Sequence, residues 1–203
     1  MNDYSYLDDL ESKSIYIIRE AYWEYKDNLA ILWSMGKDST TLVHMVRKAF
    51  LGNVPIPVIH IDTTFKFKQI YEFRDKYTKE WNLKLIVAQN EKALREGISP
   101  QKGRFNCCNA LKTEALKQVI AKYNLKALLV AIRRDEHAVR AKERYFSLRD
   151  KEFKWDYQNQ PLELWAEYYK TDTVVDTHII IHPLLHWQEI DIWMYIKKER
   201  LPV

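Results

Sequence analysis

The chain has 203 residues, enough to bury the core of one α/β domain, and 47% of them are hydrophobic, so we expect a soluble globular protein. No apolar run approaches the ~20 residues of a membrane-spanning helix. The N-terminus is acidic and polar, unlike a secretory signal, so we expect a cytoplasmic protein without a membrane partner. The net charge of +4 arises from interspersed basic and acidic residues, and no nucleic-acid partner is expected.

The spacing of apolar residues predicts a domain in which strands and helices alternate. Apolar residues recur every three or four positions between Leu7 and Tyr25, which predicts an amphipathic helix over residues 3–26 that covers a sheet. Continuous apolar strands separated by helical patterns are typical of a parallel sheet covered on both faces. We therefore expect an α/β fold with an open, mostly parallel five-stranded sheet and helices on both faces. The strands are predicted at residues 29–33, 58–61, 83–88, 125–132 and 178–182, and the intervening helices around 42–50, 71–81, 111–120 and 187–199.

The remaining long segment, residues 142–176, has no clear periodicity and is rich in Tyr, Trp and Asp. At this length it is predicted to be an irregular, functional excursion from the sheet rather than a linker. With this excursion, residues 1–203 are expected to form one nucleotide-binding domain.

A polar turn follows the first predicted strand and leads directly into a helix. Its residues are Ser34, Met35, Gly36, Lys37, Asp38 and Ser39. The N–H groups and dipole of a helix N-terminus attract phosphate, and Gly36 leaves room for the backbone to curl around an anion. Lys37 and the serines add donors, and Asp38 could hold the Mg²⁺ of a nucleotide triphosphate. The spacing differs from a Walker loop, and the alternative is an ordinary turn in which Asp38 and Ser39 cap the helix.

Charged and polar residues also follow the second and fourth predicted strands. Asp62 and Thr63 end the second strand, and Arg133 and Arg134 follow the fourth. In open parallel sheets the ligand lies outside the carboxyl ends of the strands, so these residues and the loop after the first strand can face one crevice. Arginine binds phosphate or sulfate oxygens in a bidentate manner. The alternatives are a helix cap for Asp62 and a solvated, alternately charged helix face for the arginines.

Several segments of the sequence also resemble those of a known protein family. The loop SMGKDS resembles the phosphate loop of the ATP pyrophosphatase superfamily, usually Ser-Gly-Gly-x-Asp-Ser, with Met35 in place of the first glycine. From about residue 28 to residue 203 the chain looks like the small, catalytic subunit of the heterodimeric sulfate adenylyltransferases. The segments that carry this resemblance include HIDTTFKFKQIYEFRD, RRDEHAVRAKERYFSLRD, FKWDYQNQPLELW and HPLLHWQEIDIWMYI.

The resemblance implies an adenine nucleotide alpha-hydrolase-like fold and a chain that joins ATP and sulfate into adenylyl sulfate and pyrophosphate. It also implies Mg²⁺ bound with ATP and a GTPase partner subunit. Catalysis would rest on positioning and charge stabilisation, because sulfate itself attacks the α-phosphorus. The implied nucleotide-binding residues are those of the loop from Ser34 to Ser39 together with His60, Asp62 and Thr63, the last three on the adenosine side. Lys37, Arg133 and Arg134 would be catalytic, and Arg140, Lys142 and Arg144 are candidates for binding the oxyanion.

The adjacent Cys107 and Cys108 leave alternatives open. Together with Lys112 they resemble the first half of the iron–sulfur site of the related assimilatory adenylyl-sulfate reductases. A cluster typically takes four thiolates, so with two cysteines no iron–sulfur cluster is expected. The chain stops at Val203, straight after a predicted helix, and the C-terminal segment of the family is expected to be absent. The alternatives are an adenylyl-sulfate or phosphoadenylyl-sulfate reductase, and a non-catalytic nucleotide-binding module.

Overall fold

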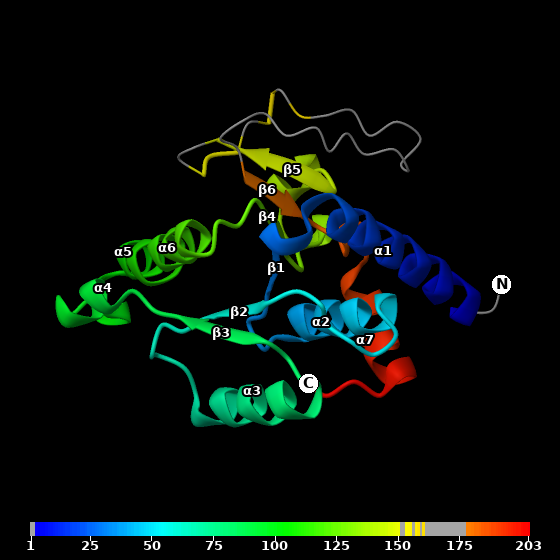
Figure 1. Cartoon of the computed structure of the whole chain (residues 1–203), viewed down its shortest axis with the longest axis horizontal. Coiled ribbons are helices and arrows are strands. Elements are labelled where there is room, and N and C mark those ends of the chain that lie inside the picture. Colours follow the sequence, from blue (N-terminus) through cyan, green and yellow to red (C-terminus); the bar gives the residue numbers. More distant parts are fainter. Residues whose placement is uncertain (1–2, 151–152, 156, 159, 161–177) are drawn as a thin grey trace.

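The computed structural model describes residues 3–150, 153–155, 157, 158, 160 and 178–203 (Figure 1). Its helices are α1 (Asp3–Tyr25), α2 (Lys37–Ala49), α3 (Lys68–Glu80), α4 (Glu91–Arg95), α5 (Arg104–Cys108), α6 (Glu114–Lys122) and α7 (Glu189–Glu199). Its strands are β1 (Leu29–Leu32), β2 (Val58–Ile61), β3 (Leu85–Ala88), β4 (Ala127–Leu129), β5 (Phe146–Arg149) and β6 (His178–Ile181). Short 3₁₀ turns occur at Lys26–Asn28, Pro100–Lys102, Arg134–Glu136 and Ala138–Lys142, and a π turn at Asn109–Thr113 leads into α6.

The strands form one six-stranded sheet in the order β3-β2-β1-β4-β6-β5. All neighbouring strands are parallel except β5 and β6, which confirms the mostly parallel sheet. The predicted count of five strands was one too few. The additional strand β5 lies within the predicted excursion and pairs antiparallel with β6, Phe146 opposite Ile181. This pairing satisfies the main-chain groups of β6, which would otherwise form an open edge. Residues 151, 152, 156, 159 and 161–177 of the excursion lie outside the described residues.

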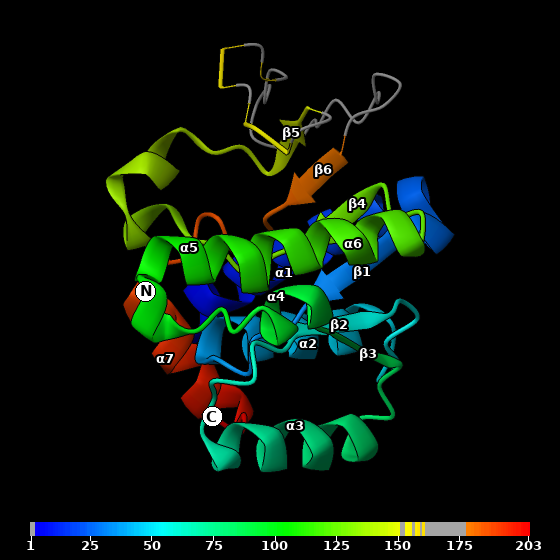
Figure 2. The same cartoon turned by 90° about the vertical axis from the view of Figure 1, so that its left-hand side faces the viewer.

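Helices cover both faces of the sheet, as predicted. On one face, Leu29, Ile31 and Trp33 of the first strand region join the core formed with α1, α2 and α7. On the other face, Ala30 and Leu128 pack beneath α6. The two groups of helices lie on opposite sides of the sheet in Figure 1, and Figure 2 shows α6 in front of it. This arrangement follows from alternation, because successive side chains of a strand point to opposite faces. None of the described helices is long and apolar enough to cross a membrane.

The order of the strands fixes the position of the candidate site. From β1 the chain proceeds through β2 to β3 on one side, whereas β4 lies on the other side of β1. The loops that leave the carboxyl ends of β1 and β4 therefore diverge, and such a switch point is where open α/β sheets bind ligands. Lys37 follows β1 and Arg133 follows β4, so the fold brings these two predicted site residues to one place.

Candidate active site

The loop after β1 is curled by its backbone and held by its two serines. Met35 has a φ of 67°, the left-handed conformation that glycine adopts more easily. Gly36 has an ordinary φ of −79° and is the N-cap of α2, with no side-chain capping bond. The alternative in which Asp38 and Ser39 cap this helix is therefore wrong. Ser39 Oγ instead accepts the Ser34 N–H at 3.2 Å and lies 3.0 Å from Ser34 Oγ, which closes the loop.

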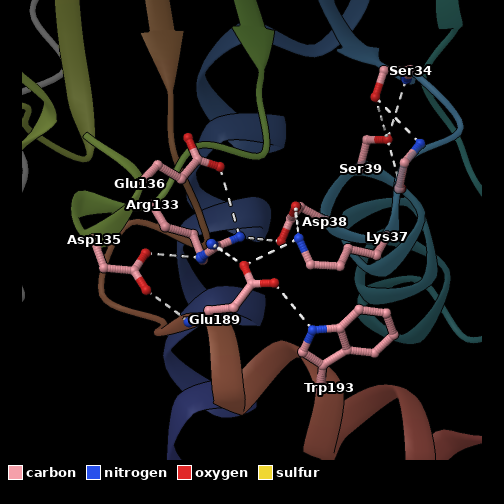
Figure 3. Close-up of polar contacts among 10 residues, drawn as sticks. Ser34, Lys37, Asp38, Ser39, Arg133, Asp135, Glu136, Glu189 and Trp193 are labelled. Atoms are coloured by element: carbon pink, nitrogen blue, oxygen red, sulfur yellow. Dashed lines mark hydrogen bonds and ion pairs between the residues drawn. The ribbon is translucent and has the colours of Figure 1, made fainter.

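An ion cluster joins this loop to the residues after β4 and to α7 (Figure 3). Arg133 is only 3% exposed; its Nε donates to Asp135 Oδ1 at 2.9 Å, and its terminal nitrogens pair with Asp38 and Glu189. Lys37 Nζ lies 3.0 Å from Asp38 Oδ2 and 3.1 Å from Glu189 Oε2. Burial by itself lowers the pKa of Arg133, but the carboxylates of Asp38, Asp135 and Glu189 outweigh burial and raise it. The two cations thus stay charged at the rim of the phosphate loop.

Glu189 was not predicted from the sequence, yet it contacts both cations. It is the first residue of α7, and its backbone N–H donates to Asp135 Oδ2 at 2.7 Å. Trp193 Nε1 donates to Glu189 Oε1 at 3.0 Å, which leaves Oε2 for Lys37 and Arg133. A single glutamate at the start of a helix gives no functional signal in a sequence, because acidic residues are common there.

Three of the other basic residues predicted for the site contact other parts of the structure. The Arg134 guanidinium donates to the Glu143 carbonyl at 3.2 Å and lies over the Tyr145 ring, so only Arg133 is brought to the loop. Arg140 pairs with Glu143 at 3.2 Å, and Lys142 is exposed near the Tyr157 ring. Arg144 is half-buried. Roles in oxyanion binding for Arg134, Arg140, Lys142 and Arg144 stay predictions.

The residues predicted on the adenosine side connect the ends of neighbouring strands. His60 is fully buried; its Nδ1 lies 3.1 Å from the Trp33 carbonyl, and Lys66 Nζ lies 3.0 Å from its Nε2. Burial and the charge of Lys66 lower the pKa of His60 to about 4, so at pH 7 the neutral ring donates from Nδ1 and accepts at Nε2. Thr63, three residues after His60, is also buried.

Asp62 holds the end of β2 in place through three hydrogen bonds. It accepts from the Thr64 N–H at 2.8 Å, the Tyr71 hydroxyl at 2.9 Å and Gln89 Nε2 at 2.8 Å. Burial raises the pKa of this carboxyl, but the donors outweigh burial and lower it. Asp62 is thus an ionised carboxylate whose two oxygens both have protein donors, and its predicted contact with a nucleotide stays a prediction.

A cavity of 530 Å³ opens between the α6 side of the sheet and the start of α6. Its lining is mostly apolar with four cationic side chains, and Ser34 belongs both to its wall and to the phosphate loop. A pocket of this size, mostly apolar with a few polar groups, is typical of a small-molecule site. The apolar lining residues, here called the floor, include Leu32, Ile59, Ile61, Leu116, Phe153 and Ile180, and the cationic ones, here called the rim, are Lys66, Lys112, Lys117 and Arg149.

None of these four cations was predicted to belong to the site. Lys112 was named only for its place near Cys107 and Cys108, and nothing in the spacing of Lys66 or Lys117 distinguishes a ligand-binding lysine from a solvated one. Arg149 reaches the cavity because β5 pairs with β6 and because the fully buried Glu143 accepts from Arg149 at 2.8 Å. A sequence interpretation without β5 has no means of placing Arg149.

Cys107 and the predicted Mg²⁺ ligand Asp38 both contact other side chains of the protein. Cys107 is 8% exposed and packs with Ala93 and Leu111 in a small apolar cluster, and Cys108 is half-buried. Both carboxylate oxygens of Asp38 face cations, Arg133 at Oδ1 and Lys37 at Oδ2, so the arrangement does not suit a metal ion at Asp38. Within the described residues no three His, Cys, Asp or Glu side chains are grouped to hold a metal.

Comparisons with known proteins identify the family of the chain. The phosphoadenosine phosphosulfate reductase domain family matches residues 28–203. Sulfate adenylyltransferase subunit 2 of Saccharophagus degradans is 45% identical over 98% of this chain and 66% of the relative. The protein of the same name from Parabacteroides distasonis is 44% identical over 100% of this chain and 68% of the relative. The chain thus spans about two thirds of the length of the curated relatives that it matches.

Solved structures share the fold at low sequence identity. A phosphoadenylyl-sulfate reductase from Candida auris, in a phosphate complex, has a TM-score of 0.65 at 17% identity and covers 100% of this chain and 89% of that one. An FMN adenylyltransferase from Candida glabrata in complex with ATP has a TM-score of 0.65 at 15% identity, over 95% and 55% of the two chains. These similarities confirm the α/β fold.

Proposed function

The chain belongs to the phosphoadenosine phosphosulfate reductase domain family, and on this premise we propose that it is the ATP-binding, catalytic part of a sulfate adenylyltransferase. The observation that carries the proposal is the convergence of Lys37 and Arg133 on one carboxylate oxygen beside the Ser34–Ser39 loop. Two fixed cations around one oxygen, next to an uncapped helix N-terminus, suit the oxygens of a polyphosphate. Relatives of 43–45% identity are named for the same activity.

In this proposal the cavity and the loop bind two parts of one nucleotide. The adenosine lies on the apolar floor formed by residues such as Ile59 and Ile61, and the phosphates extend past Ser34 to the loop. A sulfate oxygen attacks the α-phosphorus, the bond from that phosphorus to the bridging oxygen of the β-phosphate breaks, and pyrophosphate leaves with that oxygen. Lys37 and Arg133 stabilise the negative charge that develops on the leaving group. No side-chain nucleophile and no proton transfer are required.

The proposal has two further components, Mg²⁺ and a GTPase subunit, and each is judged from a different observation. Asp38 is engaged by Lys37 and Arg133, so we assign no Mg²⁺ to this side chain, and any Mg²⁺ would arrive as a counterion of the ATP phosphates. The relatives carry the name "subunit 2", which implies at least one further subunit in those proteins. We propose that this chain likewise works with a GTPase subunit.

The direct test measures pyrophosphate released from ATP by the full chain, with the GTPase subunit and GTP supplied. Sulfate is varied while chloride keeps the ionic strength constant. Release that depends on sulfate supports the adenylyltransferase. Release at the same rate without sulfate would show a plain ATP pyrophosphatase, and ATP binding without release would show a non-catalytic nucleotide-binding module.

The reductase alternative rests on the cysteine pair. Cys107 fills a small apolar cluster with Ala93 and Leu111, which supports a packing role for this thiol. The described structure thus adds no observation in favour of a reductase.

A further inference from the structure

Two of the four cations at the rim of the cavity have a carboxylate partner, and two do not. Lys117 pairs with Glu114 at 3.0 Å, and Arg149 pairs with the buried Glu143 at 2.8 Å. Within the part of the chain that the structure describes, neither Lys66 nor Lys112 has a carboxylate in ion-pair contact, and the lining of the cavity contains no acidic residue. The wall that carries these two lysines is therefore positively charged, and the carboxylate of Asp62 opposes the charge of Lys66 without forming an ion pair with it.

Lys66 is fixed in position by neutral groups. Its Nζ donates to Nε2 of neutral His60 at 3.0 Å and to the Ile61 carbonyl at 2.9 Å. The nearby carboxylate of Asp62 accepts from Thr64, Tyr71 and Gln89 instead. The ammonium group is thus oriented at the rim of the cavity, with its charge left to interact with a ligand.

In the chain without a bound anion, the surroundings of Lys66 disfavour the charged form of its side chain. Burial, followed by the charges of Lys112 and Arg74, lowers the pKa of Lys66 to about 8, although Asp62 opposes this shift. An anion that binds between Lys66 and Lys112 would relieve both the repulsion between the lysines and the loss of solvation. Neighbouring cations of this kind are a feature of anion sites.

The position of this pair agrees with the geometry of the proposed reaction. In a displacement at phosphorus, the attacking and leaving oxygens lie roughly in line on opposite sides of the phosphorus. The leaving pyrophosphate is assigned to the loop with Lys37 and Arg133. In the proposed binding mode the α-phosphate would therefore lie next to Ser34, which belongs to the loop and also lines the cavity. The attacking oxyanion must then approach from the cavity side, where Lys66 and Lys112 are located.

We propose that Lys66 and Lys112 form the subsite for the acceptor oxyanion, a tetrahedral dianion such as sulfate, with His60 as the positioning residue for Lys66. This inference rests on the proposed function, because it assigns the second substrate of the same site. It also explains why His60 is kept neutral: a protonated imidazole cannot accept from Lys66 and would repel it.

The subsite is tested by comparing two ligands that share the adenosine and the phosphate. The dissociation constants of AMP and of adenylyl sulfate are measured calorimetrically with the full chain, for the wild type, Lys66→Met, Lys112→Met and the charge-preserving Lys66→Arg. Lys68→Met is the matched control, since Lys68 is exposed and pairs with Glu72. We expect the wild type to prefer adenylyl sulfate, and Lys66→Met to reduce this preference about tenfold or more, the scale of one charge-assisted hydrogen bond.

Different results of these binding measurements would overturn the subsite alone or the proposed function as well. Retention of the preference in Lys66→Arg and Lys68→Met, with its loss in Lys66→Met and Lys112→Met, supports the subsite. A wild type that binds ATP but shows no preference, or a preference that survives both methionine variants, overturns the subsite and leaves the proposed function intact. A wild type that binds none of ATP, AMP and adenylyl sulfate overturns both.

Discussion

Glu189 Oε2 lies 3.1 Å from Lys37 Nζ, and the same oxygen pairs with a terminal nitrogen of Arg133. One carboxylate oxygen therefore bridges the two cations that we assign to the pyrophosphate. Trp193 holds the other oxygen of Glu189, so the bridging geometry is fixed from α7. A phosphate oxygen that binds both cations must compete with this carboxylate.

We expect Glu189→Gln to bind pyrophosphate more tightly than the wild type. The amide removes a negative charge from Lys37 and Arg133 but can keep the hydrogen bond from Trp193. Because Glu189 is half exposed, the gain is modest, about twofold to fivefold in affinity. Titration with inorganic pyrophosphate measures it, with the exposed Glu72→Gln as control. Equal or weaker binding by Glu189→Gln would refute the competition.

Lys37→Ala should weaken ATP binding by ~1–3 kcal/mol, the scale of one charged hydrogen bond. Lys37 is in the first turn of α2 and half-buried, and its removal leaves the loop serines in place. Equilibrium dialysis with a non-hydrolysable ATP analogue gives the affinities. Lys68→Ala, which removes an exposed lysine from α3, should bind like the wild type. Unchanged affinity of Lys37→Ala would remove Lys37 from the site.

The preference for adenylyl sulfate over AMP should decline as the pH rises above about 8. Lys66 has a pKa of about 8 in the free chain, so it carries the charge that attracts the oxyanion below this pH and loses it above. The groups that face Lys66 are neutral His60, the ionised Asp62 and the basic residues Lys112 and Arg74. Calorimetry between pH 7 and pH 9.5 measures the effect. Lys66→Arg should keep its preference to a higher pH, and a parallel decline in that variant would contradict the assignment.

Glu143→Gln should destabilise the fold by about 3 kcal/mol at pH 7, because it leaves the buried Arg149 without its charged partner. Burial raises the pKa of Glu143, but His182, Ser147 and Arg149 outweigh burial and lower the pKa to about 2. A lowered pKa stabilises the folded chain above the ordinary value of 4.5, and this contribution is lost as the pH falls toward 2. Urea unfolding at pH 7 and pH 3 should therefore show a smaller difference from the wild type at pH 3. A difference that is equal at both values would place the effect in packing instead of charge.

Much of the fold followed from local patterns. The apolar runs that became β1, β2 and β6 alternate with helical spacing, and this alternation specifies a parallel sheet before any contact is known. β5 was missed because the polar Ser147 and Arg149 interrupt its apolar residues, unlike the continuous apolar runs of the predicted strands, and because its position depends on pairing with β6 much later in the chain. Nonlocal pairing of short strands leaves a weak signal in a single sequence.

The site was predictable only where its residues follow strand ends. Arg133 and the loop from Ser34 to Ser39 follow the carboxyl ends of β4 and β1, so the topology brings them together. Glu189, by contrast, reaches the loop because α7 begins beside Asp135, a tertiary contact between residues far apart in the sequence. Arg134 is the opposite case. It follows Arg133 in the sequence and was predicted at the same site, but its guanidinium donates to the Glu143 carbonyl instead.

The central claim is that this chain joins sulfate to the adenylyl group of ATP. Incubation of the full chain with its GTPase subunit, GTP, ATP and ³⁵S-labelled sulfate tests it most directly, with chromatographic separation of the nucleotides. We predict that the label appears in adenylyl sulfate in an amount equal to the pyrophosphate released, and that Lys37→Ala reduces both together. Pyrophosphate release without label in any nucleotide would contradict the claim.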